Sequence, residues 1–559
     1  MNKVIYLLII AISVLSVSCT DELTEKPNGS YDANTFFDSA EHADMAVLGI
    51  YSSISNYNHY GWYEMAPPAS DDMYFSARTN NDNQVHDIVH YTATSTNSWV
   101  QTLWQMKYQG IDRANTAIEG IEAMPQYASD PTLRSLCGEA HFLRAFLAFD
   151  LVKFWGDVPF SEKSTETYDQ AFKARVSRED IYDVIIKDLD IASALPWASD
   201  GNIERPTAGA AYALKMRVLM QRAGYSLQLD GSITRPDDNT RKKYFQDVIS
   251  AWEAIEENGY HDLYAGGYAA LFKSISAGVS DPKENLWEIG MLQEQGRRNG
   301  SAWGIYNGPA VAEPTGISPT EQAQYMGRAN AMFYAVPEWY DFYETTDERR
   351  DVNICTYRYI WNVEQRKHIQ QARGKASYYV GKWRREWMSP DSWNKNINYG
   401  DVNFCPLRYA DMVLLAAEAY NELGDTPKAW DLLNRVRVRA GATAINTSNY
   451  SKLMAPIFKT HHPDYIDDST DEGKFRMALY FERGFELAYE GQRKYDLIRW
   501  GILYDALQLF GSKSIVNQGT KNAYPAYKNF RVGHSELLPI PLKEIQSNYK
   551  LNGINNPGY

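Results

Sequence analysis

The sequence predicts a mainly α fold with a minor β component, in which a scaffold of paired helices carries one long insertion. Apolar side chains recur at helical spacing across about residues 35–259 and again across about 401–559. Residues that favour helix starts and helix ends punctuate both segments. Between them, in about 260–400, glycine, asparagine, serine and aromatic residues increase and the helical periodicity fades. We therefore expect helices on both sides of an irregular, loop-rich region.

The composition is that of a folded, acidic chain. Of 559 residues, 44% are hydrophobic and 23% are charged, and 56 Lys and Arg against 70 Asp and Glu give a net charge of −14. Nucleic-acid binding depends on Lys and Arg side chains that neutralise phosphates. The acidic balance therefore predicts that the partners include no nucleic acid.

The first residues predict export and a lipid anchor. Met1–Lys3 is a short basic start, and Val4–Val17 is an uncharged apolar run, shorter than the ~20 residues of a membrane-spanning helix. Small residues then precede Cys19, in a pattern that resembles a lipobox. We expect 1–18 to be a lipoprotein signal peptide and 19–34 to be the lipidated cysteine with a polar tether. The alternative is an ordinary signal peptide followed by an incidental cysteine.

The first helical segment is marked by its capping residues. Asp130 followed by Pro131 is a suitable N-cap and first helical residue, and apolar residues at helical spacing follow. Ser177 opens a pattern that resembles a capping box, and Thr207 is expected to cap a helix that ends at about Arg222. A later helix over Arg241–Asn258 should stop at Gly259.

The second helical segment contains the clearest helix pair. One helix is expected over Asp411–Leu423 and ends at Gly424, and the next should begin with Thr426 as N-cap and Pro427 as first residue. The stretch AEAYNELGDTPKAWDLLNRVRVRAG resembles a tetratricopeptide unit. Such a unit leaves an apolar face open, so several must stack. The fold class is therefore a tetratricopeptide-like helical scaffold with a long irregular insertion, in a single domain over 35–559.

The insertion over about 260–400 is the expected place for binding residues, because long loops on a rigid scaffold commonly carry them. One short strand is predicted in it, at Glu284–Gly290.

The cysteines and histidines predict no metal centre and no cofactor. Cys137 falls on the apolar face of a helix and is assigned to the core, whereas Cys355 and Cys405 are left open as a possible disulfide. His461 and His462 are adjacent, so their side chains diverge. A calcium ion bound by Asp and Asn oxygens is left open, without a supporting ligand pattern.

Three glutamates in the predicted helix over about Phe475–Trp500 allow two interpretations. Glu482, Glu486 and Glu490 recur four residues apart among arginines. Two carboxylates at such spacing can serve a glycoside hydrolase, which needs them ~5–10 Å apart. The alternative is a structural network of acids and arginines between stacked helices. The network is favoured, and no GxSxG, HExxH or P-loop motif is present.

Two loop clusters carry aromatic rings beside polar side chains and lack core periodicity. The chain contains 15 Trp, 40 Tyr and 20 Phe, most of which are assigned to packing. A sugar ring packs its apolar face on an exposed aromatic ring, and its hydroxyls need fixed polar partners. The candidate ligand-binding residues are Asp72, Tyr74, Phe75, Arg78 and Asn81 in the first cluster, and Arg298, Trp303, Tyr306 and Asn307 in the second. Trp383, Trp387 and Trp393 form a third candidate.

Six blocks in order carry a resemblance to a known family. They are Trp104–Ile118, Gly138–Pro159, Arg205–Gly224, Leu407–Gly441, Glu482–Gly501 and Leu538–Tyr559, the last ending in Asn-Pro-Gly-Tyr. Together with the lipobox they cover nearly the whole chain, which resembles the SusD/RagB family of nutrient-binding outer-membrane lipoproteins. The two aromatic clusters occupy the regions from which ligand contacts tend to come in this family.

The resemblance implies a function and a partner. We expect a non-catalytic, lipid-anchored protein on the outer face of the outer membrane, where the acidic residues after Cys19 resemble an export signal. It would capture oligosaccharides or polysaccharides and pass them to a SusC-like, TonB-dependent β-barrel transporter. The alternatives are a peptide-binding member of the same family, a surface glycoside hydrolase, and a tetratricopeptide adaptor for other proteins.

Overall fold

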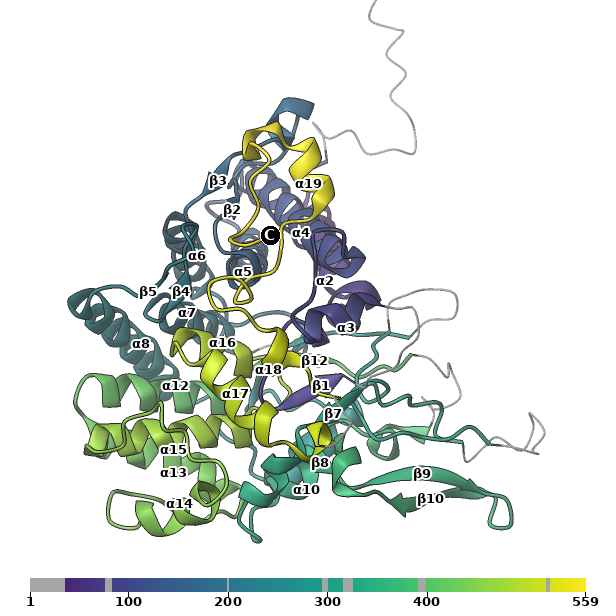
Figure 1. The fold of residues 1–559 in the computed structure, drawn as a ribbon. Coiled ribbons are helices and arrows are strands. Elements are labelled where there is room, and N and C mark those ends of the chain that lie inside the picture. Colours follow the sequence, from purple (N-terminus) through teal and green to yellow (C-terminus); the bar gives the residue numbers. More distant parts are fainter. Residues whose placement is uncertain are drawn as a thin grey trace, which may run out of the picture.

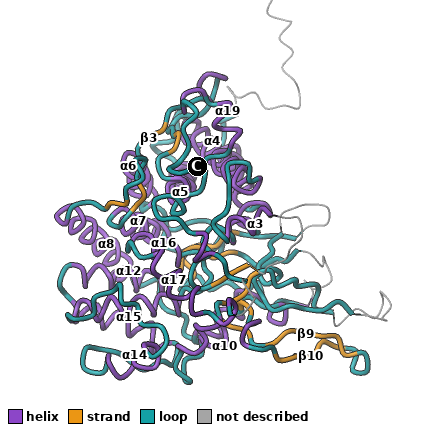
Figure 2. The backbone as a smooth tube through the Cα atoms, in the orientation of Figure 1, coloured by secondary structure: helices purple, strands orange, loops and turns teal. Residues whose placement is uncertain are grey.

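The computed structural model describes residues 36–75, 83–198, 201–293, 300–314, 325–390, 399–518 and 523–559 (Figure 1). Helices make up most of the described chain, and the strands are short (Figure 2). The predicted mainly α class with a minor β component is therefore confirmed. No helix among the described residues is both long and apolar enough to cross a membrane.

The first half of the chain forms a row of helices that pack in sequence order. α4 contacts α2 and α5, and each of α5, α6 and α7 then contacts the next helix along the chain. α5 is buried on nearly all sides. The helices are α2 (Ala40–Ile54), α3 (Asn83–Val89), α4 (Ser98–Glu122), α5 (Pro131–Trp155), α6 (Arg178–Ala192), α7 (Ala208–Arg222) and α8 (Asp238–Asn258).

The predicted caps of these helices are confirmed. The Asp130 carboxylate accepts a hydrogen bond of 2.8 Å from the Thr132 amide at the start of α5. The Thr207 hydroxyl accepts one of 3.3 Å from the Ala210 amide and starts α7. Gly259 ends α8 with a φ of 69°, in the left-handed region that favours glycine. These bonds satisfy backbone groups that a helix end leaves open.

The second half of the chain continues the helical scaffold, with two departures from prediction. α13 begins one residue earlier than expected, because Asp425 and not Thr426 caps it through the Lys428 amide. The single helix predicted over Phe475–Trp500 is wrong: two helices are separated by a turn in which Gly491 has a φ of 88°. The helices are α12 (Tyr409–Glu422), α13 (Thr426–Arg439), α14 (Tyr450–Phe458), α15 (Asp471–Glu486), α16 (Arg493–Arg499), α17 (Leu503–Lys513), α18 (Ala526–Asn529) and α19 (Leu542–Ser547).

The segment between the two halves carries half of the labelled strands, including the longer hairpin. Its elements are α9 (Tyr268–Ser276), β6 (Asn285–Ile289), β7 (Phe333–Ala335), α10 (Arg349–Asn353), β8 (Ile354–Cys355), β9 (Tyr357–Asn362), β10 (Lys367–Ala372) and β11 (Tyr379–Val380). A four-stranded sheet has the order β1–β7–β11–β8, where β1 is Met73–Phe75. β6 pairs with β12 (Phe404–Arg408), and β9 pairs with β10 as a hairpin that extends away from the helices (Figure 1). The strand predicted at Glu284–Gly290 is thereby confirmed.

One hydrophobic core joins the two halves of the scaffold and runs from Ala43 to Leu551. The C-terminal segment returns to the early helices (Figure 1), where the Trp155 indole donates to the Pro539 carbonyl at 2.9 Å. The two short hairpins β2 (Val158–Pro159) with β3 (Arg175–Val176), and β4 (Ser226–Leu227) with β5 (Ile233–Thr234), lie between early helices.

The described cysteines are all free thiols. Cys137 is buried in α5, as predicted, and burial raises the pKa of its thiol to about 11. Cys355 and Cys405 are not joined to each other. Cys19 lies outside the described residues, so its lipidation stays a prediction.

Candidate functional site

Three segments far apart in the sequence meet at one place through their backbones. The Ala302 amide donates to the Gly61 carbonyl at 2.8 Å, and Ser301 and Gly400 exchange two backbone hydrogen bonds of 2.8 Å. The approach leaves no room for side chains, because a Cβ on Gly61 would lie 2.9 Å from the Gly300 carbonyl oxygen. The glycines therefore bring residues 57–63, 300–306 and 399–401 together.

These segments carry a cluster of aromatic rings that we call the aromatic face: Tyr57, Trp62, Tyr63, Tyr306 and Tyr399. The ring centroid of Trp62 lies 4.5 Å from that of Tyr306, and Tyr399 meets Tyr57 edge-on at 4.6 Å. Tyr57 and Tyr306 are joined by a side-chain hydrogen bond. All except Tyr57 are only half-buried. Partly exposed rings held at fixed angles can each offer a face to a flat apolar surface.

The local chain is shaped by an irregular turn. After α2, residues Tyr57–Gly61 form a single π-helical turn in which His59 departs from helical geometry, and the Asn56 side chain caps it through the Asn58 amide at 2.9 Å. Such turns occur often at functional sites. Trp62 follows this turn directly, and its indole N–H is buried and has no acceptor among the described residues.

A buried charged cluster supports this turn from beneath. Lys107 of α4 is bound by Glu64 and lies 3.0 Å from the Asp150 carboxylate of α5. Although burial opposes ionisation, Lys107 and Lys153 hold the pKa of Asp150 below its usual range. The hydroxyl of Tyr60 donates to the same carboxylate. The aromatic face therefore rests on a base that is fixed by hydrogen bonds.

The described residues of the first predicted cluster, Asp72, Tyr74 and Phe75, are buried, and their expected exposure is wrong. Tyr74 and Phe75 belong to β1, where they pair with Tyr334 and Phe333 of β7, and Tyr74 is only 3% exposed. Asp72 is also 3% exposed and accepts hydrogen bonds from the Tyr489 amide at 3.3 Å and the Ser70 hydroxyl at 3.2 Å. These side chains complete a sheet and a turn. Arg78 and Asn81 lie outside the described residues.

The second predicted cluster is divided by the fold. Trp303 is 3% exposed, stacks on Phe404 at 4.7 Å, and donates its indole N–H to the Tyr60 carbonyl. Asn307 is buried and accepts a hydrogen bond of 2.8 Å from the Gly304 amide. The expected exposure of both is therefore wrong, and only Tyr306 lies on the aromatic face. Arg298 lies outside the described residues.

The two clusters nevertheless lie next to each other. The Phe333 amide donates to the Tyr306 carbonyl at 2.9 Å, and Phe333 pairs with Phe75 in the sheet. The residues of the aromatic face that sequence reasoning missed are Tyr57, Trp62, Tyr63 and Tyr399. The signal for the first three was the run Tyr57–Tyr63 (YNHYGWY), which is rich in aromatic and polar residues directly after a helix. In the third candidate cluster, Trp383 is buried and Trp387 lies under the Arg384 guanidinium, whereas Trp393 is outside the described residues.

Asp71 and Asp72 are adjacent carboxyls in unlike environments, which is the arrangement that an acid–base pair needs. Arg493 binds Asp71 through two hydrogen bonds of 2.8 and 2.7 Å. Burial, with the neighbouring Asp71 charge, raises the pKa of Asp72 to about 6. Both side chains are buried, and Tyr480 closes over Asp71 with a hydrogen bond of 3.1 Å. A substrate therefore has no access to this pair.

The three glutamates of the hydrolase hypothesis form the structural network that the sequence favoured. Glu482 binds Arg349 at 2.6 Å and Arg437 at 2.7 Å. Glu486 binds Arg439 at 2.6 Å and Arg408 at 3.0 Å, and these arginines with Arg349 hold the pKa of Glu486 below its usual value although burial opposes it. Arg408 and Lys382 bind Glu490. Every one of these carboxylates is buried and satisfied, so none is available as a general acid.

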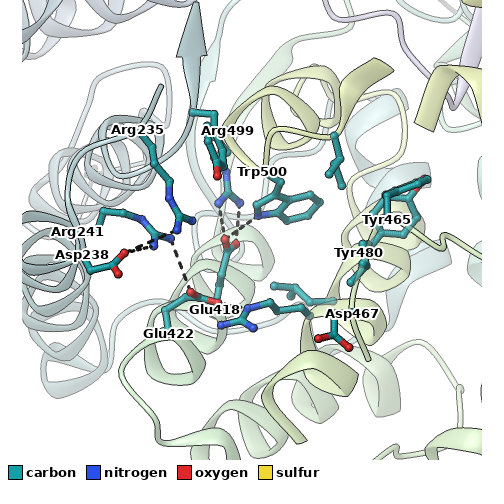
Figure 3. A pocket seen from close by; sticks show the side chains of 15 residues that line it. Arg235, Asp238, Arg241, Glu418, Glu422, Tyr465, Asp467, Tyr480, Arg499 and Trp500 are labelled. Atoms are coloured by element: carbon teal, nitrogen blue, oxygen red, sulfur yellow. Dashed lines mark hydrogen bonds and ion pairs between the residues drawn. The ribbon is translucent and has the colours of Figure 1, made fainter. Parts of the chain in front are cut away.

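A separate cavity of about 470 Å³ opens among α8, α12, α15 and the end of α16 (Figure 3). Trp500 and Arg499 both point at Glu418, with hydrogen bonds of 2.8 and 2.7 Å (Figure 3). Arg241 and Arg476 approach Glu422 at 3.7 and 2.5 Å. These charges pair with one another across the walls. The cavity can admit a small polar molecule, but its charged groups are already bound.

Two family models match the chain. One is described as "SusD family" and matches residues 283–559, and the other is described as "Starch-binding associating with outer membrane" and matches residues 23–220. Among curated proteins, "SusD-like protein P2" of Formosa agariphila is 24% identical over 560 residues, which is 97% of each chain.

Solved structures share the fold. A SusD homologue from Bacteroides thetaiotaomicron superposes with a TM-score of 0.75 at 24% identity, over 94% of this chain and 98% of that one. The surface glycan-binding protein A of the same organism, solved in complex with laminarihexaose, superposes with a TM-score of 0.63 at 20% identity, over 92% and 99%.

Proposed function

The chain belongs to the SusD family, and from that premise we propose that it is a non-catalytic glycan-binding protein of the outer-membrane surface. It captures oligosaccharides and delivers them to a SusC-like, TonB-dependent transporter. The family description of starch binding and outer-membrane association supports this assignment, as does the relative that was solved with laminarihexaose.

The aromatic face is the observation that carries the proposal. Trp62, Tyr63, Tyr306 and Tyr399 are half-buried rings on a fixed base. A pyranose ring packs its C–H face on such rings. The rings meet one another edge-on or tilted, so they face in different directions, which suits a ligand with successive sugar units.

The absence of catalysis is supported by the state of the carboxylates. Glycoside hydrolysis needs a protonated acid and a second carboxyl that both reach the glycosidic bond. The pair with unlike environments, Asp71 and Asp72, is buried, and Glu482, Glu486 and Glu490 are bound by arginines and Lys382. A binding role needs none of these groups to react.

Membrane attachment and the transporter partner rest on the sequence and the family. Lipidation of Cys19 would hold the folded body at the surface through a tether over 19–34, since several acyl chains make a stable anchor. A capture protein at the mouth of a barrel must release its ligand, so its affinity should be modest.

Calorimetry on the mature chain, expressed from Thr20 so that it carries no lipid, tests the proposal against purified oligosaccharides and peptides. We expect binding to one glycan class, with chromatography detecting no cleavage products. Trp62→Ala and Tyr306→Ala should weaken binding, whereas Tyr549→Ala, an exposed tyrosine near the C-terminus, should not. Binding of peptides alone would favour the peptide-binding alternative, and turnover of any oligosaccharide would overturn the non-catalytic assignment.

A further inference from the structure

The junction of α4 and α5 brings together three side chains of the kinds that bind transition metals. Glu122 is the last residue of α4, and Cys137 and His141 lie one turn apart on α5. One oxygen, one sulfur and one nitrogen of these residues all lie within 4.8 Å of one another. Cys137 is fully buried and His141 is 3% exposed, whereas the Glu122 side chain is 49% exposed.

The orientation of His141 is fixed by a carboxylate behind it. Its Nδ1 lies 2.7 Å from the Asp188 carboxylate of α6, which also accepts two hydrogen bonds of 2.8 and 2.7 Å from Arg144. A carboxylate only accepts, so Nδ1 carries the proton. The lone pair of the neutral ring is therefore on Nε2.

That lone pair is unused in the described structure. Nε2 of His141 is buried and makes no hydrogen bond to any described residue. It faces the Glu122 carboxylate, whose nearer oxygen is 3.8 Å away. A buried nitrogen without a partner destabilises the fold unless something else binds it.

We propose that Glu122, Cys137 and His141 bind a zinc-type divalent cation at the α4–α5 junction. Zinc prefers thiolate, imidazole and carboxylate ligands, and a carboxylate behind the histidine is its usual support. Calcium and magnesium take oxygen ligands and do not fit this donor set. Three protein ligands leave the fourth tetrahedral position to a water molecule.

Binding needs a small movement and the loss of one proton. In a tetrahedral site, zinc lies about 2.3 Å from sulfur and about 2.0–2.1 Å from nitrogen and oxygen, so ligand atoms stand roughly 3.3–3.7 Å apart. Glu122 can close the difference, because it is exposed at a helix end. The Cys137 S–H bond breaks, its proton leaves to solvent, and the sulfur binds the metal as a thiolate. No oxidant or reductant takes part.

The site lies in the helical scaffold and is independent of the aromatic face. A metal held by Glu122 and α5 closes the loop over residues 123–130 and ties the ends of two long helices together. Because the ion binds only the folded chain, it should stabilise the fold by mass action. The role we assign is therefore structural.

Titration of the chelator-treated mature chain with Zn²⁺ and Co²⁺ tests the site directly. We expect one Zn²⁺ per chain by calorimetry, a rise in Tm that a chelator reverses, and no such rise with Ca²⁺ or Mg²⁺. Co²⁺ should give a sulfur-to-metal charge-transfer band in the near ultraviolet, because a thiolate is among the ligands.

Variants separate a built site from adventitious binding. Cys137→Ser should remove the charge-transfer band and lower zinc affinity at least about tenfold, whereas Cys355→Ser, which removes another buried thiol, should retain both. Glu122→Gln, at an exposed side chain that folding does not need, should also weaken zinc binding. The proposal is overturned if no Zn²⁺ binds, if Co²⁺ binds without the sulfur band, or if Glu122→Gln binds zinc as tightly as the unsubstituted chain.

Discussion

Two regions of the molecule use residue types that bind ligands in many proteins: the glutamate–arginine network of α15 and the aromatic face. The fold buries the first region and leaves the second partly exposed. In the network, Glu482 and Glu486 are fully buried and each carboxylate has at least two cationic partners. On the aromatic face, four of the five rings are half-buried and the Trp62 indole N–H has no acceptor in the described chain.

The difference shows that a side chain can bind a ligand only if contacts within the fold leave it a free hydrogen-bonding group or an exposed face. A buried carboxylate that is paired on every side has no free lone pair and no access, so its charge serves the scaffold. A half-exposed ring has already gained part of its packing energy, and its remaining face is preorganised for a ligand. Substitutions in the two regions should therefore separate stability from binding.

The largest effect should come from breaking the network. Glu486→Gln keeps the shape of the side chain but leaves Arg408 and Arg439 without their shared carboxylate. Removing one partner of a buried ion pair costs about 3–5 kcal/mol, so urea unfolding should show a loss of that size in the free energy of unfolding.

The matched control is Asp190→Asn, in a pair with Lys215 where the aspartate is mostly exposed. Exposed pairs contribute less than about 1 kcal/mol. Similar losses in the free energy of unfolding for Glu486→Gln and Asp190→Asn would mean that burial does not strengthen the contribution of an ion pair. That result would contradict the structural role assigned to the network.

The next largest effect should be a pH dependence at Asp72. Its pKa is raised by burial from 3.8 to about 6. In the unfolded chain the Asp72 carboxyl loses its proton at a lower pH than in the folded chain. The free energy of unfolding therefore falls as pH rises between about 4 and about 6. The loss is on the order of 3 kcal/mol. Asp72→Asn should not show this pH dependence, because a side-chain amide does not titrate in this range. The variant should still fold, because its amide oxygen can accept from Tyr489 and its NH₂ can face Ser70.

Urea unfolding of both chains at pH 4 and pH 7 measures the difference, in which the other titrating groups cancel. Glycan affinity should be the same in both chains, because the Asp72 side chain is buried and is not part of the aromatic face. If Asp72→Asn abolished binding while remaining folded, the original assignment of Asp72 to the ligand site would be right after all.

Much of the scaffold was predictable from local signals. Asp130, Thr207 and Gly259 mark helix ends through bonds within a few residues, so the sequence alone is enough to place them. The break after α15 escaped prediction because apolar periodicity continues across residues 487–492 while the backbone turns through Tyr489 and Gly491 in the left-handed region.

The site was less predictable because burial is decided by distant partners. Tyr74 is covered by Tyr334 and Tyr524, and Trp303 by Phe404, none of which is near in sequence. Likewise, the segments that carry Trp62 and Tyr399 come together because Gly61 and Gly300 leave no Cβ in the way of the approach. A lack of helical periodicity identifies a loop, but it does not say whether the loop is packed.

A ring on the aromatic face should matter for binding more than for stability. Trp62→Ala removes a half-buried ring that touches Tyr306 and Tyr63. We expect glycan affinity to fall by about 1–2 kcal/mol, or roughly 5–30-fold. Calorimetry on the glycan identified in the screen provides the measurement. An unchanged glycan affinity in a folded Trp62→Ala chain would contradict the proposal that the aromatic face binds the glycan.

The smallest effect should come from a hydroxyl on the same face. Tyr306→Phe keeps the ring and removes the hydrogen bond between Tyr306 and Tyr57. If sugars bind by stacking, affinity should change by less than about threefold, or about 0.6 kcal/mol, whereas Tyr306→Ala should lose as much as Trp62→Ala. A loss in Tyr306→Phe as large as in Tyr306→Ala would show that the hydroxyl, and not the ring, contacts the ligand. The aromatic face would then resemble the network in binding through polar groups, and the distinction between the two regions would rest on exposure alone.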